Sequence, residues 1–224
     1  MAKLKWDASG EHYYETGVKN GVLYVQDDDG TYPKGVAWNG LTAVTQSPSG
    51  AEATALYADD IKYLNLYSTE EFAATIEAYT YPDEFAKCDG SYQLVDGVDG
   101  VYVGQQTRKA FGLAYKTVLG NDLKNNKYGY KIHLIYGAMA APSEKAYATI
   151  NDSPEAITFS WELSTTPISI DGELNATSYI EIDSTKLKDQ SKLQQLENML
   201  FGSESGEAEL PLPSEIIKIL KTEG

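Results

Sequence analysis

The sequence offers two histidines, His12 and His133, and one cysteine, Cys88, as candidate bases, nucleophiles or soft metal ligands. Imidazole and thiolate groups bind zinc when several are grouped, as in HExxH or paired CxxC motifs. Neither histidine has such a neighbour, and a single cysteine forms no intramolecular disulfide. We therefore expect both histidines to be satisfied or exposed strand residues. Cys88 is expected to be a buried structural thiol rather than one activated by Lys87.

The acidic run DDDGT at residues 27–31 begins like a calcium-binding loop. Such a loop needs a bidentate glutamate about eight residues after its final aspartate, but Ala37 and Trp38 stand there. The sequence therefore predicts a plain acidic turn and no metal site.

Two carboxylate pairs, Asp59-Asp60 and Glu70-Glu71, have the residue types of a glycosidase, which requires an acid and a second carboxylate in one cleft. Adjacent residues in a strand point to opposite faces, so neither pair is expected to act together. The sequence also has no GxSxG, GxxxxGK[ST] or GxGxxG motif. We predict a protein that is not an enzyme and has no cofactor.

The composition indicates a single acidic domain over residues 1–224. With 33 acidic against 18 basic residues, the formal charge of −15 opposes any surface that grips nucleic acid. The start shows no signal peptide, and no stretch approaches the roughly 20 apolar residues of a membrane span. We expect a soluble protein that is made in a cytoplasm and does not contact a membrane.

Alternating apolar residues, typical of half-buried strands, dominate the chain. The clearest example is ITFSWEL at 157–163, and the runs 108–119 and 128–136 form a predicted long hairpin around the polar turn NDLKNN. Asn20-Gly21 predicts a second hairpin, and Asp59-Asp60 a third. Strands 108–119 and 157–164 have little charge, so at least one of them is a candidate edge for pairing with another subunit.

A further strand is predicted over 72–81, and helices are predicted over 82–88, 185–202 and 213–221. The stretch 202–213 has the composition of a mobile linker. Together these elements predict a mainly β fold of two packed antiparallel sheets, a sandwich or barrel, flanked by an α-helix. Residues 1–35 are expected to form an N-terminal arm with a hairpin, and 202–224 a C-terminal linker and short helix.

The chain has 17 tyrosines and five phenylalanines. Tyrosine suits strand packing, but it is also enriched in subunit contacts and in ligand-stacking platforms, and composition leaves these alternatives open. The strand 128–136 ends in small residues, which let another backbone approach closely. This corner is a candidate subunit contact or a tight intramolecular bend; its residues are Gly137, Ala138, Met139, Ala140, Ala141 and Pro142.

Several stretches occur in an order that resembles a known protein family. They are WNGL at 38–41, SPSGAEATALYADDIKY at 47–63, ATIEAYTYPDEFAKCDG at 74–90, YKIHLIYGAMAAPSEKAYATIND at 130–152 and ITFSWELSTTP at 157–167. In this order the chain resembles the major tail proteins, or tail tube proteins, of long-tailed, siphovirus-type phages and prophages of Gram-positive bacteria. The resemblance covers about residues 36 to 183, and none of its motifs is a catalytic signature.

The resemblance implies stacked hexameric rings of the chain itself, whose sheets join around a lumen through which DNA passes without specific binding. It also implies a tail in the virion, assembled in the host cytoplasm, with a tape-measure protein, a tail terminator and distal tail proteins as partners. Within this class it points to a non-contractile tail. An acidic wall would repel DNA and leave it no sites to grip during transit.

In tail tube proteins a long loop near 46–60 reaches the adjacent ring, so this loop is the candidate ring-stacking segment. The N-terminal segment and the 202–213 stretch are further candidate inter-ring arms, and an ordinary flexible hairpin loop is the alternative for 46–60. The alternative function is a monomeric, tyrosine-rich β-sandwich that binds carbohydrate or a cell-surface ligand. The candidate stacking residues are Gln46, Ser47, Pro48, Ser49, Gly50, Ala51, Glu52, Ala53, Thr54, Asp59 and Asp60.

Overall fold

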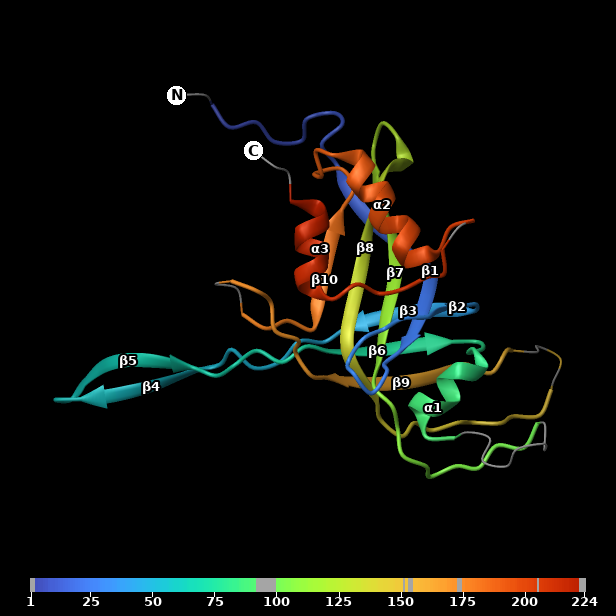
Figure 1. Cartoon of the computed structure of the whole chain (residues 1–224). Helices are drawn as coiled ribbons and strands as arrows, with labels where there is room; N and C mark the ends of the chain where they lie inside the picture. Colours follow the sequence, from blue (N-terminus) through green and yellow to red (C-terminus); the bar gives the residue numbers. More distant parts are fainter. Residues whose placement is uncertain are drawn as a thin grey trace.

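The computed structural model describes residues 3–91, 100–150, 152, 155–172, 175–204 and 206–221, and it is built mainly from antiparallel strands (Figure 1). The strands are β1 (Tyr13–Val25), β2 (Gly35–Trp38), β3 (Leu41–Gln46), β4 (Ala53–Ala58), β5 (Ile61–Tyr67), β6 (Ala73–Ala78), β7 (Phe111–Asn121), β8 (Asn125–Ala140), β9 (Phe159–Thr165) and β10 (Tyr179–Asp183). The helices are a 3-10 turn η1 (Asp83–Phe85), α1 (Ala86–Asp89), α2 (Gln190–Phe201) and α3 (Pro213–Leu220).

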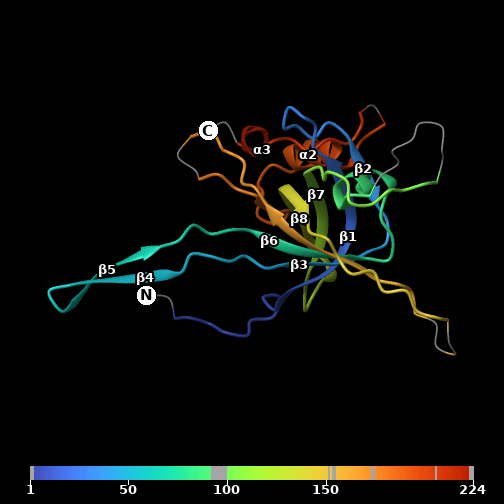
Figure 2. The same cartoon turned by 90° about the horizontal axis from the view of Figure 1, so that it is seen from below.

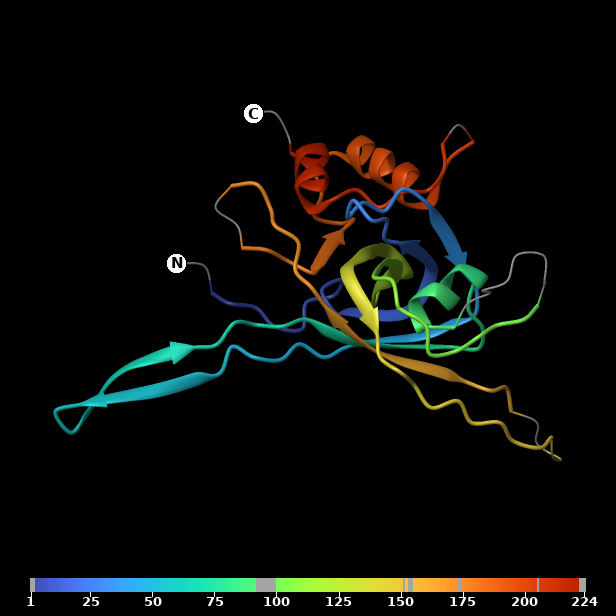
Figure 3. The same ribbon diagram turned by 60° about the horizontal axis from the view of Figure 1, so that its bottom comes forward.

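Eight strands form one sheet. Seven of them follow the order β2-β1-β7-β8-β9-β6-β3, and the eighth, β10, pairs with β8. The 16-residue strand β8 makes this branching possible. Its middle pairs with β10, from Lys131 to Ile135, and its end pairs with β9, from Ala138 to Ala140. The sheet therefore curls into two layers, as Figure 3 shows, with β3, β6 and β9 crossing β1, β7 and β8.

Two apolar cores lie on opposite faces of the β1, β7 and β8 layer. The inner core lies between the two sheet layers and includes Leu23, Trp38, Ile76, Phe85, Phe111, Leu113, Ile135 and Trp161. The helix-side core lies under α2 and α3 and includes Tyr24, Tyr32, Ile132, Leu134, Tyr136, Leu193, Leu196, Leu200, Leu210 and Ile216. Alternation along β7 and β8 supplies both cores, because successive side chains point to opposite faces. The predicted fold of two packed antiparallel layers flanked by a helix is confirmed.

Most predicted elements occur close to their expected positions, including the hairpins around 121–125 and 59–60 and the strand over 73–78. Helix α2 begins five residues later than predicted. The Asp189 carboxylate accepts N–H bonds from Ser191 and Lys192, which defines the helix start. Residues 183–185 instead form a turn, in which Asp183 accepts hydrogen bonds from the backbone and hydroxyl of Thr185.

The predicted hairpin at Asn20-Gly21 is wrong, because β1 runs without reversal from Tyr13 to Val25. The positive φ angles at Gly17 (73°) and Asn20 (53°) accompany two register shifts against β7. Residues able to take positive φ serve β-bulges as well as turns, and here they bend a continuous strand. Residues 13–25 thus lie inside the sheet, between β2 and β7, rather than in a terminal arm.

The predicted pairing edges are also wrong. β7 lies between β1 and β8, and β9 lies between β8 and β6, so both strands are interior. Their low charge accompanies strand pairing on both sides rather than an edge ready to pair. In the described part of the chain, the outermost strands of this sheet are β2 and β3, while β10 pairs only with β8.

Within the predicted linker at 202–213, residues 208–213 are held against the body. The backbone N–H of Leu210 donates to the carbonyl of Tyr32 at 3.1 Å, and the Tyr136 hydroxyl donates to the carbonyl of Pro211 at 2.9 Å. Leu210 is buried in the helix-side core. The composition was misleading because the buried residues Leu210, Pro211 and Pro213 follow a polar, exposed start.

Candidate assembly surface

The acidic run at 27–31 forms a turn, as predicted. The Asp29 carboxylate accepts hydrogen bonds from the Thr31 N–H at 3.0 Å and from its hydroxyl at 2.7 Å, and the Asp27 N–H donates to the Thr31 carbonyl. Within the described residues, no three His, Cys, Asp or Glu side chains are grouped so as to hold a metal ion.

Cys88 is fully buried in the inner core, and burial raises the pKa of its thiol to about 12. At that pKa the group stays a neutral thiol at physiological pH and is a poor nucleophile. The geometry therefore agrees with the predicted structural thiol.

The two carboxylate pairs lie at opposite ends of a projecting hairpin. Asp59 and Asp60 form the turn between β4 and β5, whereas Glu70 and Glu71 follow β5 at its base. Seven residues of β5 separate them, which is roughly 23 Å of strand at about 3.3 Å per residue. That separation is too long for the two pairs to act together as one glycosidase site.

His133 lies in a polar cluster that joins five strands. Its Nε2 is 2.7 Å from the Thr117 hydroxyl and its Nδ1 is 2.7 Å from the Tyr179 hydroxyl, which confirms a satisfied strand histidine. The ring stacks on Tyr115 at 4.6 Å. The cluster borders an open depression of about 390 Å³, which also receives Gln46 from β3.

Two carboxylates face this histidine, Glu15 from β1 and Glu181 from β10. Lys131 bridges them, with Nζ 2.9 Å from Glu15 and 3.0 Å from Glu181. Burial lowers the pKa of His133, and nearby Lys131 lowers it further, while the two carboxylates act in the opposite direction. The net shift is downward, so His133 is neutral in the folded protein at pH 7. The sequence did not predict this cluster, since its members come from distant strands.

We expect the protein to lose stability as the pH falls below about 6.5, the ordinary histidine pKa. A group whose folded pKa is depressed binds its proton more readily in the unfolded chain, so protonation favours unfolding. Glu15, whose pKa is also lowered, adds its own loss only nearer pH 4. Urea unfolding at pH 7.5 and 5.5 measures the free energy of unfolding at each pH. Between these two values His133→Gln should lose less of that free energy than the parent protein loses. His12→Gln is the control, and an equal loss in the His133 variant would contradict the assignment.

Strands β4 and β5 form a two-stranded ribbon that projects away from the body (Figure 1). Neither strand contributes a residue to the inner core or the helix-side core. The ribbon nevertheless exposes large apolar side chains, with Tyr57 72% and Tyr63 and Tyr67 each 69% exposed. The others exposed on it are Leu56, Ile61, Leu64 and Leu66. Exposed apolar surface of this kind marks an interaction site in a soluble protein.

Both faces of the ribbon are apolar. Leu56 is paired with Leu64 across the strands, and these two side chains share one face. Tyr67 is paired with Ala53, and this pair lies three residues along the strands from Leu56 and Leu64, so it occupies the other face. Tyr57 directly follows Leu56 and also points to that other face. A strand that is apolar on both faces is typical of burial on both sides. This signal was present in the sequence, in ATALYA and IKYLNLY.

The candidate stacking residues divide between the base, the stalk and the tip of this projection. Gln46 ends β3 and donates to the Tyr115 hydroxyl at 2.8 Å. Ser49 and Glu71 exchange backbone hydrogen bonds, and the Glu52 N–H donates to the Ser68 hydroxyl. Residues 47–52 are therefore one chain of a hydrogen-bonded stalk rather than an independent loop. Asp59 and Asp60 lie at the tip.

The candidate contact at Gly137–Pro142 is largely occupied within the chain. Ala138 and Ala140 are buried in the inner core. Gly137 has φ +58°, and a Cβ there would lie 2.3 Å from the carbonyl oxygen of Thr166. The small residues thus permit a close intramolecular bend, which was the alternative interpretation. Residues 141–150 then leave the body on the side opposite the ribbon (Figure 2), and a subunit contact there remains a prediction.

No helix in the described ranges is long and apolar enough to cross a membrane.

The fold and the ribbon define a mainly β protein with a projecting two-stranded arm. Comparisons with known proteins do not assign this protein to a family. No protein-family profile matches the chain, and no curated protein matches it. Among solved structures it is similar to a chain of the anti-feeding prophage (AFP) baseplate, at 8% identity and a TM-score of 0.34, over 82% of this chain and 100% of that one.

A second similarity is to a chain of the PVC sheath-tube complex, an extracellular contractile injection system in its extended state. The identity is 13% and the TM-score 0.30, over 73% of this chain and 88% of that one. TM-scores this low support no argument about fold or function.

Proposed function

We propose that the protein is a structural subunit that polymerises as stacked hexameric rings to form the tail tube of a phage. The observation that carries this proposal is the β4–β5 ribbon. It exposes apolar side chains on both faces and packs on neither core. Leaving that surface in water is costly, at about 25 cal/mol per Å² of apolar area, so burial against another subunit is favourable.

The sequence supplies the kind of assembly. The ordered motifs between residues 36 and 183 resemble tail tube proteins, and the inter-ring loop that the resemblance implies at 46–60 includes β4 and the tip of the ribbon. Among the described strands, β3 has a partner on one side only, as does β10. Such strands have backbone groups that can pair with another subunit, and closing a ring removes them from solvent.

The finer features of the proposal follow from the resemblance and the charge. The net charge of −15 suits a conduit wall that repels DNA and does not grip it. The tape-measure protein, tail terminator and distal tail proteins are proposed partners. The proposed location is the virion tail, after assembly in the host cytoplasm. No catalysis and no cofactor form part of the proposal.

The alternative is a monomeric module that binds carbohydrate or a cell-surface ligand, which requires aromatic side chains gathered on one exposed face. The exposed tyrosines are instead spread over five regions, two of which are Tyr79, just after β6, and Tyr102. Tyr13 and Tyr14 lie at the start of β1, Tyr57, Tyr63 and Tyr67 on the ribbon, and Tyr147 on the chain that leaves β8. This distribution favours assembly.

Negative-stain microscopy and sedimentation velocity of the concentrated, purified protein test the proposal. We expect hollow rings or tubes that increase with concentration, because subunit association follows mass action. A protein that stays monomeric at every concentration and binds glycans would contradict it and support the alternative.

A further inference from the structure

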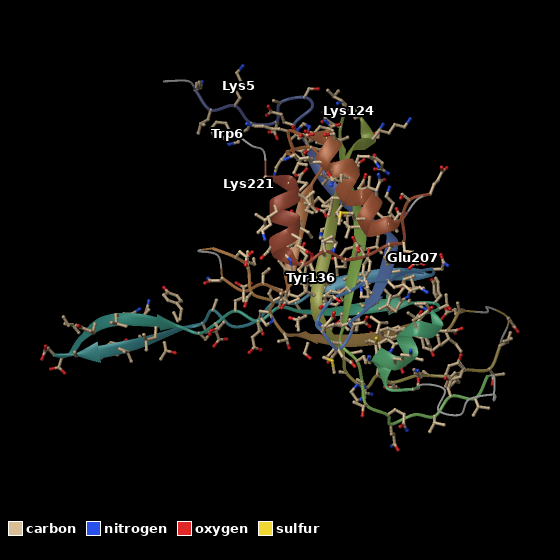
Figure 4. The ribbon with its side chains drawn as sticks, in the orientation of Figure 1. Lys5, Trp6, Lys124, Tyr136, Glu207 and Lys221 are labelled. Atoms are coloured by element: carbon tan, nitrogen blue, oxygen red, sulfur yellow. The ribbon has the colours of Figure 1, made fainter. Side chains whose placement is uncertain are left out.

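A depression lined by lysines lies at the end of the body formed by the β7–β8 turn. It has a volume of about 650 Å³, and its basic residues are Lys19, Lys124 and Lys127. Its other lining residues are Asn126, Tyr128, Gly129, Tyr130, Ser184, Thr185 and Gln190. Figure 4 shows Lys124 at this end, near the N-terminal segment that carries Lys5 and Trp6. No carboxylate lines the depression, although the chain has 33 acidic residues.

The three lysines have no carboxylate partner among the described residues, whereas six of the other 14 lysines do. Within the described part of the chain, none of the three makes an ion pair, and Lys124 lies over the ring of Tyr128 instead. Ion pairs are made by Lys109, Lys116, Lys131, Lys145, Lys186 and Lys218. Three unpaired ammonium groups in one concavity attract an anionic group, and Tyr128 and Tyr130 add apolar walls.

The tip of the ribbon supplies such a group. Asp59 and Asp60 are both exposed, and neither makes an ion pair with a described residue. Their φ angles of 51° and 62° place both in the left-handed region, where asparagine and glycine are the preferred turn residues. The two carboxylates therefore stand next to each other at the far end of an apolar arm. The arm extends sideways from the body, away from the β7–β8 turn (Figures 1 and 4), so the contact is with another molecule.

We propose that the Asp59-Asp60 tip of one subunit docks into the lysine depression of a second copy of this chain. The inference rests on the proposed self-assembly and adds the site that receives the arm. Copies that each have a charge of −15 repel one another, so assembly needs local complementarity at the contact. Docking places two carboxylates among three ammonium groups and fixes the register of the arm, while the leucine and tyrosine faces supply apolar burial.

Charge reversal tests this contact. A tip variant has Asp59→Lys and Asp60→Lys, and a depression variant has Lys19→Glu, Lys124→Glu and Lys127→Glu. Each alone is expected to reduce sedimented tubes by at least about tenfold, because like charges then face each other. A chain with both sets is expected to regain assembly. The control has Lys34→Glu, Lys87→Glu and Lys188→Glu, which changes the net charge by the same amount at other exposed sites and should assemble normally.

The outcomes separate this contact from the proposed function. Normal assembly of both reversed variants, or no recovery in the combined chain, would overturn the contact while leaving a tube-forming protein. Absence of assembly in the parent protein would overturn the proposed function and the contact together. If the depression variant assembles normally but loses salt-sensitive binding of a short DNA duplex that the parent shows, the lysines bind nucleic acid instead. Thermal unfolding by circular dichroism confirms that each variant is folded.

Discussion

A chain whose ribbon is replaced by a two-residue turn is expected to fold as a stable monomer and to form no rings or tubes. The structure indicates where to shorten it. The Ser68 N–H donates to the Glu52 carbonyl at 3.2 Å, so the two chains of the stalk already lie side by side there. Asn-Gly between Glu52 and Ser68 suits a two-residue hairpin turn. The body should tolerate the change, because residues 53–67 contribute to neither core.

Two measurements distinguish lost assembly from lost folding. Negative-stain microscopy reports rings and tubes, and thermal unfolding should change by no more than about 4 °C, the effect of about 1 kcal/mol in a domain of this size. A full-length variant with Leu56→Ser, Leu64→Ser and Leu66→Ser should also fail to assemble. Its matched control, with Thr54→Ser and Asn65→Ser, keeps the apolar area and should form tubes. Tubes of parental length from the shortened chain would show that the ribbon is not the assembly surface.

The sequence predicted those elements whose pattern is both local and repeated. The hairpin of β7 and β8 follows from uninterrupted alternation on both sides of a polar turn. In β9, Trp161 and Leu163 are buried and Glu162 is exposed, as alternation requires. Local turn chemistry also located the ribbon tip at Asp59-Asp60. These features need no knowledge of what lies across the sheet.

The wrong predictions concern sequence patterns that are compatible with two different local structures. Asn20-Gly21 suits a turn or a bulge, and only pairing with β7 selects the bulge. Low charge on β7 and β9 suits an edge or an interior strand, and strand order alone decides which. The 202–213 stretch reads as a linker until Tyr32 and Tyr136 are seen to bind its backbone.

The candidate sites were predictable to different degrees. The ribbon is continuous in sequence, so its apolar character on both faces was available before the fold was known. The His133 cluster and the lysine depression were not, because each gathers side chains from separate strands. Lys19 of β1 lines the same depression as Lys124 and Lys127 because β1 pairs with β7, the strand that leads into the β7–β8 turn. Such sites depend on register, which alternation does not determine.

Replacing Trp161 by alanine is expected to lower the free energy of unfolding by about 3–5 kcal/mol, the usual cost of deleting a large buried ring. Trp161 is 1% exposed at the centre of the inner core. Its ring centroid lies 4.9 Å from Phe85, 5.3 Å from Tyr81 and 6.0 Å from Trp38. Alanine would leave a cavity among rings contributed by β2, η1 and the segment between β6 and η1. Urea unfolding measures the loss, and a change below about 1 kcal/mol would contradict this packing.

Two further variants separate packing from other causes. Trp161→Phe keeps most of the ring volume and removes an indole N–H that has no hydrogen-bond partner among the described residues, so it should cost much less than alanine. Trp6→Ala, at a side chain 74% exposed, should change stability by no more than about 0.5 kcal/mol. Because Trp161 lies far from the ribbon in the chain and inside the body, its alanine variant should still form tubes at temperatures where it remains folded. Ribbon variants should fail to assemble at every temperature. Assembly measured as a function of temperature therefore distinguishes a variant with a destabilised fold from one that lacks the assembly surface.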